Sequence, residues 1–149
     1  MLRSTILHPE LLYGLSLCGH GSKILIADAN FPVITKTPPA AKKIFLNIAP
    51  GLVDATTILK LIIEIIPVES AAIMATPDIV EQPIHTAYRS ILGTTISITG
   101  FKRMEFYECS ENKETCLVIA TGETRRFANL LLTVGVIMPG ITTAMSNVK

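Results

Sequence analysis

Hydrophobic and polar positions divide the chain into apolar runs that suit buried strands and apolar stripes with helical spacing. Residues 23–27 are apolar after Lys23 and rich in isoleucine, which is typical of a strand buried on both faces. After Asp54, apolar residues recur every three or four positions until Pro67. This spacing predicts a helix that Asp54 caps and Pro67 closes.

The remaining segments continue the alternation of helices and strands. His8-Pro9-Glu10 opens a first helix, because proline suits the first helical position and glutamate suits the positive end of the helix dipole. Another helix is expected over 79–92, with Pro83 as an alternative first turn. Residues 102–108 fit a helix or a strand equally. Strands are expected over 44–46, 71–75, 94–99, 115–121 and 127–136, and a proline-bearing loop outside the core over 32–39.

Strands separated by helices favour an α/β fold with a mainly parallel sheet covered by helices on both faces. We therefore expect a single three-layer α/β/α domain. No internal repeat, low-complexity segment or domain linker interrupts the pattern. The domain is placed at residues 1–138, and residues 139–149 are expected to form a flexible C-terminal tail.

The charge and the hydrophobic content of the chain indicate which kinds of molecule it binds. The formal net charge is +1, without a basic stripe or an acidic tail, which argues against nucleic acid or an anionic membrane surface as a partner. The chain is 49% hydrophobic and only 17% charged, whereas soluble domains carry about a quarter charged residues. An excess of apolar surface in a chain of this length favours a homo-oligomer.

Neither a membrane span nor a secretory leader is expected. The strongest apolar run, 58–66, carries Lys60 and Glu64, and it is far shorter than the roughly 18 to 20 apolar residues that a span needs. The first residues do not resemble a signal-peptide core. The three cysteines have no metal-binding spacing and are interpreted as free, buried thiols, which indicates a reducing cytoplasm.

The first candidate for chemistry is His20, which lies between Gly19 and Gly21 just before the 23–27 strand. Asp28 follows that strand, where α/β sheets usually carry their functional groups. Each residue also has an ordinary interpretation, His20 as a turn residue and Asp28 as a cap or turn former. If they cooperate, a twisted sheet or a neighbouring subunit must bring them together.

Other sites are disfavoured. The histidines at 8, 20 and 85 are scattered and form no metal-binding pair, so no metal ion is expected. No glycine-rich phosphate loop is present, and Ser22 precedes a strand, whereas the serine of a nucleophile elbow follows one. His85 lies in a predicted helix and is interpreted as a core or surface residue.

Two polar clusters lie nearer the C-terminus. One surrounds Arg103 and the other runs from Thr121 to Asn129. Their ordinary interpretations are solvated charges, core aromatic residues and turn formers.

Taken in order, three blocks of sequence resemble the RbsD/FucU family of cytoplasmic sugar mutarotases, and its FucU branch in particular. The first is Gly19-His20-Gly21 with Asp28-Ala29-Asn30-Phe31-Pro32. The second is Arg103-Met104-Glu105-Phe106-Tyr107-Glu108, and the third is Thr121-Gly122-Glu123 with Phe127-Ala128-Asn129. The resemblance covers most of the chain, although roughly 38–99 match mainly in their apolar pattern.

The resemblance implies an RbsD-like fold and a cofactor-independent isomerase that interconverts anomers of a free monosaccharide, with an L-fucose-like pyranose as the expected substrate. His20 matches the family's catalytic histidine. The sugar-binding positions of the family match Asp28, Arg103, Phe127, Ala128 and Asn129. The family also implies ring-shaped homo-oligomers, often decamers, with sites near subunit contacts.

Two departures from the family pattern keep alternatives open. Many relatives have aspartate where this chain has Ser22, and many have tyrosine where it has Phe127. The lost hydroxyl at 127 favours a non-catalytic sugar-binding or regulatory subunit, whereas the retained His20 favours the enzyme. A D-ribose pyranase is a further alternative, but Arg103 matches the FucU branch, where the ribose branch typically has histidine.

Overall fold

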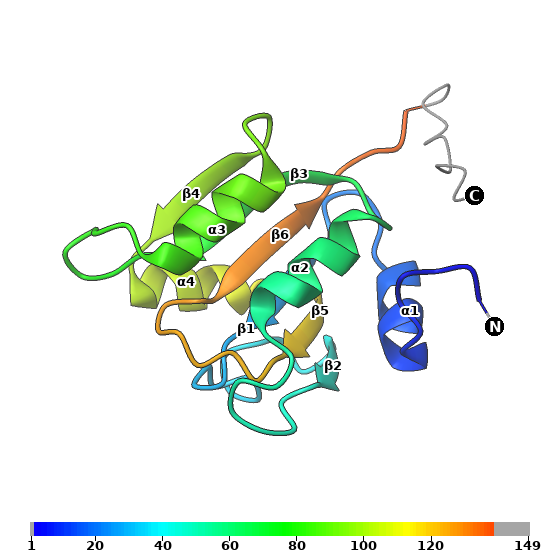
Figure 1. The fold of residues 1–149 in the computed structure, drawn as a ribbon, viewed down its shortest axis with the longest axis horizontal. Coiled ribbons are helices and arrows are strands. Elements are labelled where there is room, and N and C mark those ends of the chain that lie inside the picture. The colour runs from blue at the N-terminus through cyan, green and yellow to red at the C-terminus, as the bar shows by residue number, and fades with distance from the viewer. Residues whose placement is uncertain (1, 139–149) are drawn as a thin grey trace.

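In the computed structural model, which describes residues 2–138, a mixed six-stranded sheet lies between helices (Figure 1). The predicted tail, 139–149, lies outside the described residues. In chain order the elements are α1 (Pro9–Ser16), β1 (Lys23–Ala27), β2 (Lys42–Phe45), α2 (Ala55–Ile63), β3 (Val68–Met74), α3 (Pro83–Leu92), β4 (Ser97–Phe101), α4 (Arg103–Ser110), β5 (Thr115–Ala120) and β6 (Leu130–Val134).

The order of strands across the sheet is β2-β5-β1-β6-β3-β4. The pairs β2/β5, β5/β1 and β3/β4 are parallel, while β6 runs antiparallel to both β1 and β3. The prediction of a mainly parallel sheet is therefore confirmed. Because β6 runs the other way, its first residues meet the carboxyl ends of β1 and β3 at one edge of the sheet.

The two faces of the sheet are covered differently. Leu11 of α1, Leu59 of α2 and Tyr88 of α3 belong to the apolar core on one face, and Figure 1 shows β6 between α2 and α3. On the other face, Phe106 of α4 packs with Phe31 and neighbouring loop residues. The structure is thus three-layered, as predicted.

The loop after β1 differs from the prediction that it lies outside the core. Val33 is 7% exposed and Thr37 is 5% exposed, and Val33 packs into the α4-side core. The Thr37 hydroxyl donates a hydrogen bond to the Val33 carbonyl, so the polar side chain is satisfied locally. The segment therefore covers part of the sheet where a second helix would otherwise lie.

Local signals explain where the helices begin. The His8 side chain accepts a hydrogen bond from the Leu11 amide at the start of α1, and Asp54 does the same for Thr57 at the start of α2. Pro83 is the first residue of α3, so the alternative start within 79–92 is the observed one. Residues 102–108, which fitted either element, form most of α4.

Strand ends differ from the prediction by a few residues. The strand expected over 94–99 is observed as Ser97–Phe101, and the strand expected over 127–136 is observed as Leu130–Val134. The later start of β6 has a clear cause, because Phe127 has a φ of 60° and cannot belong to an extended strand.

Within residues 2–138, no helix has the length and apolar character needed to cross a membrane. In the same range, no cluster of three or more histidine, cysteine, aspartate or glutamate residues has the arrangement of a metal site.

Gly122 is required by a close approach of two backbone segments. Its amide donates to the Val53 carbonyl, and its carbonyl accepts from the Gly51 amide. A β-carbon at this position would collide with the carbonyl oxygens of Leu52 and Ala49. The 49–53 turn and the loop after β5 therefore pack together only because residue 122 has no side chain.

We predict that Gly122→Ala lowers the free energy of unfolding by about 1–3 kcal/mol, because backbone atoms on both sides must move to admit the methyl group. Chemical denaturation followed by circular dichroism measures this change. Gly19→Ala is the matched control, since a β-carbon there meets nothing within 4 Å. Equal effects of the two substitutions would contradict the close-packing argument.

Candidate active site

A pocket of about 370 Å³ opens at the edge of the sheet where β1 and β3 end and β6 begins. This volume falls within the range of about 300–1,000 Å³ that is usual for small-molecule sites. The antiparallel direction of β6 explains how residues far apart in sequence meet here. The lining residues are Asp28, Asn30, Phe31, Met74, Arg103, Tyr107, Arg126, Phe127 and Asn129.

Asp28 and Asn129 hold one another at the base of the pocket. The Asn129 Nδ2 atom donates to Asp28 Oδ2 over 2.9 Å, and the Asp28 amide donates to Asn129 Oδ1 over 2.9 Å. The Asn30 amide donates to the other carboxylate oxygen, Oδ1. Burial raises the pKa of Asp28, and these hydrogen bonds oppose that rise only in part. The carboxylate is therefore fixed in orientation beside the cavity.

Phe127 adopts a backbone conformation that is rare for a residue with a side chain, at a φ of 60°. Two buried side chains of α3 hold it there. His85 Nε2 lies 2.9 Å from the Phe127 carbonyl oxygen, and the Tyr88 hydroxyl donates to the Ala128 carbonyl over 2.6 Å. Because a carbonyl oxygen only accepts, Nε2 of His85 must carry the proton. His85 is thus a core residue, one of the two interpretations that its sequence allowed.

Two guanidinium groups border the ring of Phe127. The distance from the ring centroid to Cζ is 6.0 Å for Arg103 and 5.4 Å for Arg126. Among the described residues, neither arginine forms an ion pair with a carboxylate. Their N–H groups are therefore available to a ligand that enters the pocket.

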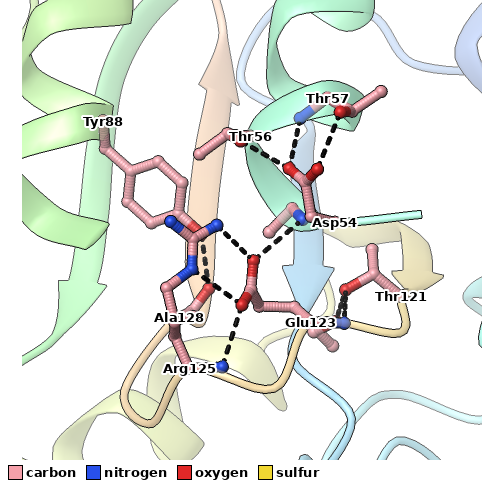
Figure 2. A network of polar contacts seen from close by, with 10 residues as sticks. Asp54, Thr56, Thr57, Tyr88, Thr121, Glu123, Arg125 and Ala128 are labelled. Carbon is pink, nitrogen blue, oxygen red and sulfur yellow. Dashed lines mark hydrogen bonds and ion pairs between the residues drawn. The ribbon is translucent and has the colours of Figure 1, made fainter. Parts of the chain in front are cut away.

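An ion pair between Arg125 and the buried carboxylate of Glu123 fixes the loop that leads into this segment (Figure 2). Arg125 donates to both oxygens of Glu123, with Nε–Oε1 at 2.8 Å and Nη2–Oε2 at 2.6 Å. The Ala55 amide at the start of α2 also donates to Glu123. Burial raises the pKa of Glu123, but the Arg125 contacts outweigh it and leave the pKa below its usual value. The carboxylate of Glu123, only 2% exposed, therefore stays charged and anchors the loop.

His20 lies at the opposite end of the sheet from the pocket. It precedes β1 while Asp28 follows it, and five strand residues span roughly 16 Å. The neighbouring Gly21 amide bonds to the Val134 carbonyl, at the far end of β6 from Asn129. The His20 side chain is 62% exposed, and its Nε2 lies 3.1 Å from Glu69 Oε2. Within one chain the structure does not bring His20 to the pocket.

Four of the five predicted sugar-binding residues, Asp28, Arg103, Phe127 and Asn129, line the same pocket. The fifth, Ala128, is fully buried and contributes its carbonyl to the contact with Tyr88. The sequence analysis did not select Met74 or Arg126. Met74 ends β3, and the neighbouring Arg-Arg-Phe sequence was the only local signal for Arg126.

Comparison with known proteins identifies the family. The model of the RbsD / FucU transport protein family matches residues 1–137. The chain belongs to this family. It is 40% identical over 145 residues to a fucose mutarotase of Homo sapiens, covering 89% of this chain and 90% of that protein.

Solved structures of the family agree in fold. The fucose mutarotase of Streptococcus pneumoniae in complex with L-fucose superposes with a TM-score of 0.73 at 34% identity, over 88% of this chain and 94% of that one. Bacillus subtilis RbsD complexed with D-ribose gives a TM-score of 0.80 at 29% identity, over 93% and 100%. The expected family and the RbsD-like fold are therefore confirmed.

The hydrogen bond between His85 and the Phe127 carbonyl should contribute to the free energy of unfolding. His85→Met removes the N–H donor while keeping an unbranched side chain, so we expect the free energy of unfolding to fall by about 1–2 kcal/mol. His85→Gln has the same shape as the methionine variant but retains a donor. It should recover most of that loss.

The hydrogen bond to the Phe127 carbonyl can also be followed by NMR with selective isotope labels. Phe127-Ala128 is the only Phe-Ala pair in the sequence, so ¹³C-carbonyl phenylalanine with ¹⁵N-alanine gives one correlated signal. We expect its carbonyl shift to move upfield in His85→Met and to stay near the wild-type position in His85→Gln. Identical shifts in both variants would show that the hydrogen bond does not hold this carbonyl.

Proposed function

We propose that this protein is a cofactor-independent monosaccharide mutarotase, an isomerase that interconverts the anomers of an L-fucose-like pyranose. Membership of the family and the similarity to fucose mutarotases support the class of activity. The observation that carries the proposal for this chain is the pocket in which Asp28, Asn129 and Arg103 converge. These residue types bind sugar hydroxyl groups by fixed donors and acceptors.

Mutarotation needs little besides a bound sugar and a group that moves protons. One proton leaves the anomeric hydroxyl and one reaches the ring oxygen, which opens the hemiacetal. The aldehyde then rotates and the ring closes on its other face. Imidazole suits this exchange because it gives and takes a proton near neutral pH. In the proposal His20 is this acid and base, and no metal ion or organic cofactor takes part.

Asp28, Arg103 and Asn129 are assigned to sugar binding. The Asp28 carboxylate accepts hydrogen bonds from sugar hydroxyls, and the Arg103 guanidinium donates them. Asn129 keeps the carboxylate of Asp28 oriented. Phe127 and Ala128 supply backbone and an apolar ring surface next to the sugar. Polar contacts of this kind discriminate between sugars more sharply than apolar contacts do.

The distance between His20 and the pocket implies that a neighbouring subunit supplies the histidine. We therefore propose a homo-oligomeric ring, a decamer by analogy with the family, with each site near a subunit contact. Exposed apolar side chains beside the pocket support such a contact. Ile34 is 69% exposed and Phe45 is 54% exposed, and both line a hollow that also reaches Asp28.

The three cysteines remain free thiols in the structure, which supports the proposal that the protein works in the reducing cytoplasm. No nucleic-acid or membrane partner is proposed, because the formal net charge is only +1 and the sequence has no basic stripe.

Two alternatives share the same pocket. A D-ribose pyranase is supported by the likeness to Bacillus subtilis RbsD complexed with D-ribose, whereas Arg103 favours the fucose-like sugar. A non-catalytic sugar-binding or regulatory subunit is supported by Phe127, which lacks the hydroxyl that many relatives have. However, the fold fixes the backbone of Phe127, and a role of position 127 through its backbone does not need the hydroxyl.

Saturation-transfer NMR of anomer exchange tests the proposal. We expect the anomers of L-fucose to exchange faster with the protein than without it. The acceleration over the uncatalysed exchange should be larger for L-fucose than for D-ribose. In His20→Ala this acceleration should fall by about 100-fold or more, because general acid–base groups contribute about 10²–10⁴ to rates.

His8→Asn is the matched histidine control, since asparagine also caps a helix and His8 is the N-cap of α1, not a residue of the proposed site. It should retain the wild-type rate. Full activity in His20→Ala would remove His20 from the mechanism. Sugar binding without acceleration in the wild type would favour the non-catalytic alternative.

A further inference from the structure

Two of the three cysteines lie against one another near the end of the sheet that carries His20. The Sγ atoms of Cys18 and Cys116 are 2.8 Å apart, although 98 positions separate them in sequence. Cys18 follows α1 and Cys116 belongs to β5, and both residues are partly exposed. The third cysteine, Cys109, is in α4 on the other face of the sheet.

Backbone contacts hold both sulfur atoms in place. Cys18 Sγ lies 3.3 Å from the Gly14 carbonyl oxygen, and Cys116 Sγ lies 3.6 Å from the Lys23 carbonyl oxygen. The Cys18 amide also donates to the Leu15 carbonyl at the end of α1. The two thiols therefore meet because two rigid elements position them, and a bond between them requires little backbone movement.

We propose that Cys18 and Cys116 form a thiol–disulfide exchange site. The co-reactant is a low-molecular-weight disulfide, such as oxidised glutathione, and the product is an intramolecular disulfide between the two cysteines. This proposal does not rest on the mutarotase proposal, although the cysteine pair lies near His20. The pair is at the other end of the sheet from the pocket of Asp28, Arg103 and Asn129.

The environment distinguishes the two sulfur atoms. A hydrogen bond joins the two sulfur atoms, and either of them can be its donor. With Cys18 as the donor, this contact lowers the pKa of Cys116 despite burial. The same contact and burial raise the pKa of Cys18. We assign the first attack to Cys116, because its pKa is the one that the contact lowers, and the second attack to Cys18.

The exchange balances in two steps. The Cys116 thiolate attacks one sulfur of oxidised glutathione, which forms a mixed disulfide and expels one glutathione thiolate. The Cys18 sulfur then attacks Cys116 Sγ as its proton passes to solvent, which forms the protein disulfide and expels the second glutathione. Protonation of both leaving groups gives two glutathione thiols. Two electrons have moved from the protein thiols to the glutathione disulfide.

Intact-mass analysis of the full-length protein after incubation with oxidised glutathione tests the proposal. Wild type and Cys109→Ser should each lose about 2 Da, the two hydrogen atoms given up on forming one disulfide. Peptide mapping of the oxidised wild type, which needs no variant, should recover Cys18 joined to Cys116. Cys18→Ser should stop at the mixed disulfide on Cys116, and Cys116→Ser should form no internal disulfide.

Three results would overturn the proposal. The first is wild-type protein that accumulates glutathione adducts without the internal disulfide. The second is a cross-link that includes Cys109. The third is an oxidised protein that unfolds at a lower temperature than the reduced one, because a bond between pre-positioned sulfur atoms should raise the unfolding temperature and not strain the fold.

Discussion

The reciprocal contact of Asp28 and Asn129 is the interaction on which the pocket depends. It joins the carboxyl end of β1 to the start of β6 through two hydrogen bonds, each 2.9 Å long. Both side chains are nearly inaccessible to solvent, at 5% and 3% exposed, so each needs the other as a hydrogen-bond partner. The antiparallel direction of β6 makes this contact possible, because a parallel strand would begin at the other end of the sheet.

Structure around this pair restrains the remainder of the site. Glu123 and Arg125 anchor the loop that approaches β6, and His85 and Tyr88 fix the backbone just before Asn129 (Figure 2 labels Glu123, Arg125 and Tyr88). The left-handed conformation of Phe127 is unfavourable by itself by about 1–3 kcal/mol and persists because these contacts determine it. The pocket is therefore formed before a ligand arrives, which lowers the entropic cost of binding.

Much of the fold could be predicted because its signals are local. The strand at Lys23–Ala27 and the cap at Asp54 follow from hydrophobic period and capping chemistry alone. The start of β6 could not be predicted, since nothing in the sequence around Phe127 requires a positive φ. That conformation depends on His85, which is 42 positions away.

In the candidate site too, single residues could be predicted from the sequence, whereas the contacts between them depend on the tertiary fold. Asp28 was selected by its position after a strand and Asn129 by resemblance, but their contact depends on the register between β1 and β6. Arg126 and Met74 were missed because they reach the pocket only through the order of strands across the sheet. The contact between Cys18 and Cys116 likewise depends on the packing of α1 next to β5, so their spacing in sequence carried no signal.

We propose that each catalytic site combines His20 of one subunit with the Asp28 pocket of another. Co-expression of His20→Ala with Asp28→Asn, with a different affinity tag on each, allows the mixed oligomers to be purified and their anomer exchange measured. Each variant alone should be nearly inactive. In the mixed oligomers about a quarter of the sites should combine an intact histidine with an intact pocket, and activity should return to about that fraction of wild type. Mixed oligomers as inactive as the single variants would contradict a shared site.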